Sequence, residues 1–171
     1  MKNLRFLAPL AALGPLLSIA CPSASAAPEH SPVETQSYEF EFGCGDFDVR
    51  ISGSSATTFT EWLDDQGEVY KVRMQVSAPA DVVTNLDSMK AVTVSAHFVQ
   101  TYTRVPDTNE FTVTVVGHRY LATEPGEGII MRDVGRIVFS DPSEEIVSAA
   151  AGKHDAATPN LLGPALCGLV D

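Results

Sequence analysis

Apolar and polar residues alternate along most of the chain, from about residue 37 to about residue 151. A repeat of two residues is that of a β-strand, in which successive side chains point to opposite faces of the sheet. Because only one of the two alternating sets is apolar, each strand is expected to bury one face and expose the other. The clearest runs are SYEFEF (37–42), FDVRIS (47–52), VYKVRMQVSA (69–78), AVTVSAHFVQTYT (91–103), FTVTVVGHRYLA (111–122) and GIIMRDVGRIVF (128–139).

The segments between these runs carry the Gly, Pro, Asn and Asp residues that tight turns require. They are DDQGE (64–68), TNLDSMK (84–90), VPDTNE (105–110) and EPGEG (124–128). Strands separated by about 8–15 residues are typical of antiparallel sandwiches and barrels. The pattern therefore predicts an all-β fold, an antiparallel meander of about 8–10 strands that closes into a barrel or a barrel-like sandwich.

The last residues, 157–171, break this rhythm and predict a short helical tail. Thr158 is a suitable N-cap, and Pro159 stands where a first helical residue tolerates proline. Apolar residues follow at helical spacing, and Pro164 limits the helix to a short or interrupted one.

The N-terminal residues 1–26 have the features of a secretory signal peptide. Lys2 and Arg5 precede an apolar run that is too short for a bilayer span, and Ala24 and Ala26 are small residues that suit cleavage after residue 26. The expected product is a secreted protein with a flexible leader at 27–36 and a single β domain at 37–171. An alternative is a lipid anchor at Cys21, which is disfavoured because Ser18 replaces the usual aliphatic residue.

Two cysteines remain after removal of the signal, Cys44 and Cys167. An even pair in an exported protein is usually a disulfide, and this one would join the first long strand to the C-terminal tail. No zinc-binding spacing surrounds these cysteines, so we expect neither a metal site nor another cofactor.

The charge of the chain restricts its partners. Removing residues 1–26 lowers the 11 basic residues to 9 and leaves all 22 acidic residues, so the formal charge changes from −11 to −13. Nucleic acid and anionic membrane surfaces both require a basic face. Neither is an expected partner, and no segment beyond the signal could span a membrane, which leaves an unknown small molecule or an extracellular protein.

The run EPGEGIIMRDVGRIVF (124–139) combines a Pro-Gly-x-Gly turn, an apolar strand and Asp-x-Gly-Arg. With TNLDSMK (84–90) and TYTRVPDTNEFTVTVVG (101–117), it resembles small exported β-proteins of high-GC Gram-positive bacteria over roughly residues 40–155. This resemblance implies an architecture and an exported location but no activity. The chain is also similar, at the level of fold alone, to lipocalin-like and allene-oxide-cyclase-like barrels, which says little about function.

Asp133 and Gly135 interrupt the apolar face of the last predicted long strand. Pairing this strand with the preceding one, with Arg119 opposite Met131 and Gly117 opposite Asp133, keeps both apolar sets on one face. In that register Arg119 is a diagonal neighbour of Asp133, within reach of its long side chain. The inward face of the strand before them adds two more polar residues, Gln100 and Tyr102.

Three interpretations of this cluster follow. Gln100, Tyr102, Arg119 and Asp133 could bind a ligand at the mouth of a barrel, with Asp133 and Arg119 as the only catalytic candidates. Asp133 and Arg119 could instead form a structural ion pair, since a buried carboxylate must be matched. Alternatively, Gly135 could mark a β-bulge. The two structural interpretations are preferred, because ion pairs without a function are common.

The histidines support no metal or catalytic site. His97 and His118 are expected to point outward, and His154 lies beside Asp155 in a segment expected to be solvated. The motifs HExxH and GxSxG are both absent from the sequence.

Without a catalytic motif, the preferred function is a non-catalytic binding or interaction module. The alternatives are a small barrel enzyme of cyclase, isomerase or hydrolase type that uses Asp133 and Arg119, and a structural or lipid-anchored cell-envelope protein. The sequence leaves open whether the protein is an enzyme.

Overall fold

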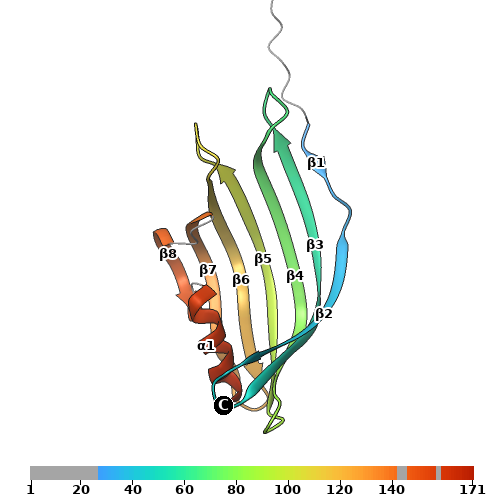
Figure 1. Ribbon diagram of the computed structural model, residues 1–171, viewed down its shortest axis with the longest axis vertical. Helices are drawn as coiled ribbons and strands as arrows, with labels where there is room; N and C mark the ends of the chain where they lie inside the picture. Colours follow the sequence, from blue (N-terminus) through green and yellow to red (C-terminus); the bar gives the residue numbers. More distant parts are fainter. Residues whose placement is uncertain (1–26, 142–145, 157–158) are drawn as a thin grey trace, which may run out of the picture.

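A computed structural model describes residues 27–141, 146–156 and 159–171. The described residues form eight strands and one helix (Figure 1). They are β1 (Glu29–His30), β2 (Glu34–Gly43), β3 (Asp48–Leu63), β4 (Val69–Asn85), β5 (Ala91–Arg104), β6 (Phe111–Glu124), β7 (Gly128–Asp141), β8 (Ile146–His154) and α1 (Pro159–Val170). The signal peptide expected at residues 1–26, with cleavage after residue 26, lies outside the described residues.

All strands belong to one antiparallel sheet, which confirms the predicted all-β meander with a C-terminal helix. From β3 to β8 each strand pairs with the next, and β1 and β2 both pair with β3 at the other edge. The sheet curls so that one face is concave, and α1 lies across the lower part of that face (Figure 1). Because β8 does not pair with β1 or β2, the sheet stays open, so of the two predicted forms it fits the barrel-like sandwich and not the closed barrel.

The prediction of a flexible leader at residues 27–36 is wrong for most of that segment. Glu29 and His30 form β1 opposite Glu61 and Thr60 of β3, and β2 begins at Glu34. Ser31 strengthens the edge, since its backbone N–H donates to the carbonyl of Phe59 and its Oγ accepts from the N–H of Phe59. These contacts use backbone groups, so an edge strand can form from residues whose side chains are polar.

The core of the molecule divides into two clusters along the concave face. The lower cluster packs the sheet against α1, and its buried members are Val49, Ile51, Val83, Val92, Val94, Ala122, Met131, Leu166, Leu169 and Val170. The upper cluster lies on the sheet alone and consists of buried Val113, Val115 and Ile137 with partly buried Phe98, Tyr102 and Phe139. The helix therefore covers only part of the apolar face that the strand alternation creates.

Two links hold α1 in this position. The disulfide between Cys44 and Cys167 confirms the predicted pairing and joins the end of β2 to the helix. Buried Asn85 donates from Nδ2 to the carbonyl of Val170 at 3.1 Å, while its Oδ1 accepts backbone N–H groups of the turn after β4. The helix is thus attached to the sheet at its C-terminal end by covalent and polar contacts.

Gly135, which interrupts the apolar face of β7, is one of three glycines that lie side by side on neighbouring strands. We call this row of glycines the crease. Gly117, Gly135 and Gly152 lie opposite one another on β6, β7 and β8, with φ angles of 127°, 138° and 119°. A Cβ on Gly135 would stand 1.9 Å from the carbonyl oxygen of Ala151. Only glycine adopts this conformation without strain and permits such a close approach of strands, so the three residues form a bend in the sheet.

The observed register of β6 and β7 differs from the predicted register. Asp133 lies opposite Tyr120, and Gly117 lies opposite Gly135 instead of Asp133. Register shifts between His118 and Tyr120 and between Ala122 and Thr123 each add a residue that alternation cannot reveal. Asp133 still faces the concave side, because two shifts leave the overall alternation of faces nearly unchanged.

Candidate functional site

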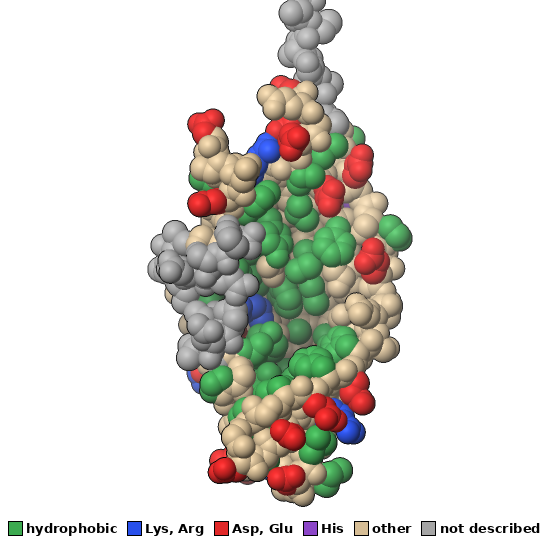
Figure 2. All heavy atoms as spheres, in the orientation of Figure 1, with side chains coloured by type: hydrophobic (Ala, Val, Ile, Leu, Met, Phe, Trp, Pro, Cys, Tyr) green, Lys and Arg blue, Asp and Glu red, His purple; other side chains and the backbone are tan. Residues whose placement is uncertain are grey.

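A cavity of about 360 Å³ lies at the lower end of the concave face, between β2, the sheet and α1. In Figure 2 the concave face is hollowed and lined by hydrophobic side chains, with acidic side chains around its edge. The volume of the cavity is near the lower limit for pockets that hold small molecules. The lining residues are Tyr38, Phe40, Phe42, Ile51, Asp81, Tyr120, Leu162, Gly163 and Leu166.

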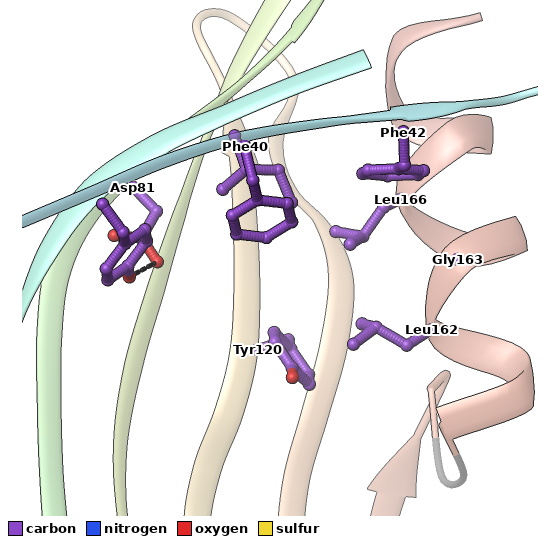
Figure 3. A pocket seen from close by; sticks show the side chains of 9 residues that line it. Phe40, Phe42, Asp81, Tyr120, Leu162, Gly163 and Leu166 are labelled. Atoms are coloured by element: carbon purple, nitrogen blue, oxygen red, sulfur yellow. Dashed lines mark hydrogen bonds between the residues drawn. The ribbon is translucent and has the colours of Figure 1, made fainter. Parts of the chain in front are cut away.

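The two walls of the cavity follow from local sequence patterns. Alternation along β2 places Tyr38, Phe40 and Phe42 on one side of the strand, and all three line the cavity. Figure 3 shows Phe40 and Phe42 extending from β2 on the same side. Leu162 and Leu166 are four residues apart in α1 and therefore share one face of the helix. Phe40 remains 51% exposed, which is unusual for a large aromatic side chain.

The polar end of the cavity consists of Tyr38 and Asp81, which are 43 residues apart in the chain. The hydroxyl of Tyr38 donates to Asp81 Oδ2 at 2.6 Å (Figure 3). Burial, and then this hydrogen bond, raise the pKa of the Tyr38 hydroxyl well above its usual range. Tyr38 therefore stays protonated and acts as the donor in this pair.

Asp81 occupies a place that two backbone features create. Its Oδ1 would be 1.9 Å from a Cβ on Gly53, so the carboxylate lies in the space that the glycine leaves. A register shift between Ala78 and Asp81 turns this part of β4, and Pro79 lies inside the shift. A proline within a strand often marks a bulge, and bulges redirect side chains.

One oxygen of this carboxylate is left without a partner. Asp81 Oδ1 is fully buried and has no hydrogen bond to any described residue. A buried acceptor without a donor costs about 1–3 kcal/mol. Tyr120, the third polar residue of the lining, also has its pKa raised, chiefly by burial. The polar end of the lining therefore holds a carboxylate whose hydrogen-bonding capacity the described residues do not fill.

The predicted site residues Arg119 and Asp133 meet elsewhere, in a buried ion pair. Arg119 Nη2 donates to Asp133 Oδ2 at 2.6 Å and to the carbonyl of Ala156 at 2.9 Å. His154 Nδ1 lies 2.7 Å from Asp133 Oδ1. The Asp133 side chain is 1% exposed, Arg119 15% and His154 9%. Both carboxylate oxygens are thus occupied, which is the geometry of a structural pair.

The prediction that His154 lies beside Asp155 in a solvated segment is wrong. The Nε2 atom of His154 lies 3.2 Å from the carbonyl oxygen of Ala151, so both ring nitrogens face acceptors. Asp155 instead accepts from the backbone N–H of Arg132. The sequence contained no signal for the contact between His154 and Asp133, which depends on the pairing of β7 with β8.

Gln100 and Tyr102, the other two predicted site residues, lie in the upper half of the concave face. Gln100 Nε2 donates to Tyr102 Oη at 2.6 Å, next to the upper core cluster. Gln100 pairs with Val115 on β6, whereas Asp133 pairs with Tyr120 on the same strand. At about 3.3 Å per residue, these positions are about 16 Å apart. The four predicted residues therefore form two separate pairs.

Other recesses are less suited to binding. The one between the hairpin ends, about 480 Å³, is lined by turn residues and by Asp64. Asp64 is already satisfied, because it accepts from Arg104 and from the backbone N–H groups of Gln66 and Glu68. These contacts also lower the pKa of Asp64. This recess does not include Asp81 Oδ1, the buried side-chain acceptor that has no partner among the described residues.

Comparisons with known proteins give no further indication. No family model matches this chain, and no curated protein or solved structure is similar to it at a significant level. In the described part of the chain, no helix has both the length and the apolar character that a membrane span needs. The same residues contain no group of three or more His, Cys, Asp or Glu side chains that could hold a metal ion.

Proposed function

We propose that this protein is an exported binding module that takes a small, mainly apolar molecule into the cavity between β2 and α1. The observation that carries the proposal is the combination of an apolar lining with one buried, unpartnered acceptor, Asp81 Oδ1. Convergence of an apolar wall with a few oriented polar groups is characteristic of small-molecule sites.

Export is supported by two features. Residues 1–26 have the basic, apolar and small-residue order of a signal peptide. The disulfide between Cys44 and Cys167 suits an oxidising compartment. It also joins the two walls of the cavity, which would keep the cavity preformed and lower the entropic cost of binding.

Binding is favoured over catalysis. Both oxygens of Asp133, the only predicted catalytic carboxylate, are held by Arg119 and His154. The described residues that line the cavity include no serine, cysteine, lysine or histidine, and the one carboxylate among them, that of Asp81, accepts a hydrogen bond from Tyr38. The proposal therefore assigns the cavity a ligand and no reaction.

The cavity can be tested by filling it from the helix. Gly163 lines the cavity and Gly168 does not, and a Cβ on either residue would have no atom within 4 Å. Both Gly163→Leu and Gly168→Leu should fold, since leucine is the better helix former. The two variants make the same substitution in the same helix and differ in whether the new side chain enters the cavity.

The measurement is isothermal titration calorimetry with 1-octanol, a neutral apolar probe. Wild type should bind octanol with a negative heat-capacity change, the signature of apolar burial. Gly163→Leu should weaken binding about tenfold or more, while Gly168→Leu should leave it unchanged. If wild type shows no binding, or if the two variants behave alike, the cavity is not the binding site and the proposal is wrong.

A further inference from the structure

We propose that the ligand of this cavity is an amphiphilic amine, whose ammonium group donates to Asp81 while its apolar part lies against β2 and α1. This inference rests on the proposed function, because it names the class of molecule that the same cavity would bind. It follows from the hydrogen-bonding capacity of the polar end, from the charges around it and from the position of Asp81.

The polar end of the cavity offers acceptors and lacks a matching donor. Asp81 Oδ2 is engaged by the hydroxyl of Tyr38, and Asp81 Oδ1 is buried without a partner among the described residues. Tyr38 uses its only proton in this bond, so its oxygen can only accept from a ligand. A ligand that reaches this end must therefore bring N–H or O–H donors.

The charges favour a cationic donor over a neutral one. None of the described residues that line the cavity is a lysine, arginine or histidine, so the carboxylate of Asp81 has no positive partner among them. The guanidinium of Arg119 lies 6.0 Å from the ring of Tyr120, a lining residue, and is bound to Asp133 and to the carbonyl of Ala156. A hydrogen bond between two charged groups in an apolar surrounding is about twice as strong as a neutral one.

The same charges disfavour anionic amphiphiles. A fatty acid would place a second carboxylate beside Asp81 inside an apolar cavity, where repulsion is weakly screened. The formal charge of −11 for the chain acts in the same direction at longer range. The site therefore selects by attraction of an amine and by repulsion of an acid.

Gly53 fixes the carboxylate at the end of the cavity. Its missing side chain leaves the space in which Asp81 lies, and a Cβ there would also stand 2.7 Å from Asp81 Cγ. Gly53→Ala should therefore displace the carboxylate without removing it. Loss of amine preference in this variant would show that the position of the charge matters as well as its presence.

The test compares four probes of equal chain length by isothermal titration calorimetry at pH 7. They are octylamine, 1-octanol, octanoate and octyltrimethylammonium. Octylamine should bind about tenfold or more tightly than octanol, and octanoate should bind most weakly. Octyltrimethylammonium has the charge but no N–H donor, so it should bind less tightly than octylamine.

Three variants locate the preference. Asp81→Asn retains the shape of the side chain and an acceptor for Tyr38 but removes the negative charge, so it should abolish the preference for octylamine over octanol. Tyr38→Phe should keep the preference, because the carboxylate remains. Asp65→Asn removes an exposed acid in the β3–β4 turn, outside the cavity, and should change nothing.

The outcomes separate this inference from the proposed function. If octanol binds and Gly163→Leu weakens it, but octylamine is no tighter or Asp81→Asn keeps the preference, the amine inference alone is overturned. If neither octanol nor octylamine binds, both proposals are wrong. Should Asp81→Asn fail to fold, octylamine that binds no more tightly than octyltrimethylammonium would still overturn the amine inference.

Discussion

Replacing Asp133 with alanine tests the view that its cluster stabilises the fold. The side chain is 1% exposed and accepts hydrogen bonds from two partners, Arg119 at 2.6 Å and His154 at 2.7 Å. Asp133→Ala removes both bonds and the negative charge between them. The guanidinium of Arg119 and the ring of His154 would then face each other across an apolar site without compensation.

The expected loss of stability follows from this geometry. Hydrogen bonds to charged groups contribute about 1.5–3 kcal/mol each, and removal of one partner from a buried ion pair costs about 3–5 kcal/mol. Arg119 and His154 keep 15% and 9% of their side-chain surface exposed, so water can partly solvate them after the substitution. The lower end of the range is therefore appropriate, and Asp133→Ala should cost about 3 kcal/mol.

Urea unfolding followed by circular dichroism measures this loss. At typical slopes of about 1–3 kcal/mol per molar urea, 3 kcal/mol lowers the midpoint by about 1–3 M. Adding Arg119→Met to Asp133→Ala should cost little more, because it removes an uncompensated cation.

The exposed pair of Arg50 and Glu41 provides the control. Their side chains are 42% and 50% exposed, so Glu41→Ala should cost less than about 1 kcal/mol. If Asp133→Ala is as mild as Glu41→Ala, the cluster does not stabilise the fold and a role for Asp133 in binding would have to be reconsidered.

Three further outcomes are expected. Gly135→Ala should destabilise the protein by about 3 kcal/mol or more, because its Cβ would stand 1.9 Å from a carbonyl oxygen. Gly126→Ala, also at positive φ but in open space, should cost about 1–2 kcal/mol. Equal losses of stability in urea unfolding would argue against the crease. Reduction of the Cys44–Cys167 disulfide should lower the melting temperature, with a loss of up to about 5 kcal/mol of folding stability, and should weaken octanol binding. An unchanged melting curve would mean that the disulfide does not stabilise the fold. Because the pKa of Tyr38 is raised in the folded protein, the unfolded chain loses this proton first as pH rises above the ordinary value of 10.0. The free energy of unfolding should therefore fall above that pH, and less steeply in Tyr38→Phe. If the free energy of unfolding depends on pH in the same way in the variant and the wild type, the Tyr38–Asp81 hydrogen bond is contradicted.

The candidate site was only partly accessible to sequence reasoning. The alternation along residues 37–42 correctly placed Tyr38 on the apolar face of its strand, but nothing in that pattern identified Asp81 as its partner. Pro79, directly after the alternating run 69–78, was a usable signal, since it marks the shift that precedes Asp81. By contrast, the contact between His154 and Asp133 depends on how two strands align, which no local pattern encodes.

The sequence by itself determined the elements of this protein, because local rules decide them. Alternation predicted the strands, Thr158 and Pro159 predicted the helix, and two cysteines left a single possible disulfide. Only the tertiary structure decided that the sheet bends at aligned glycines and stays open, and that Asp81 rather than Asp133 lies in the cavity. The physical reason is that bulges and glycine bends change register and curvature by one residue at a time, and these small shifts decide which distant side chains meet.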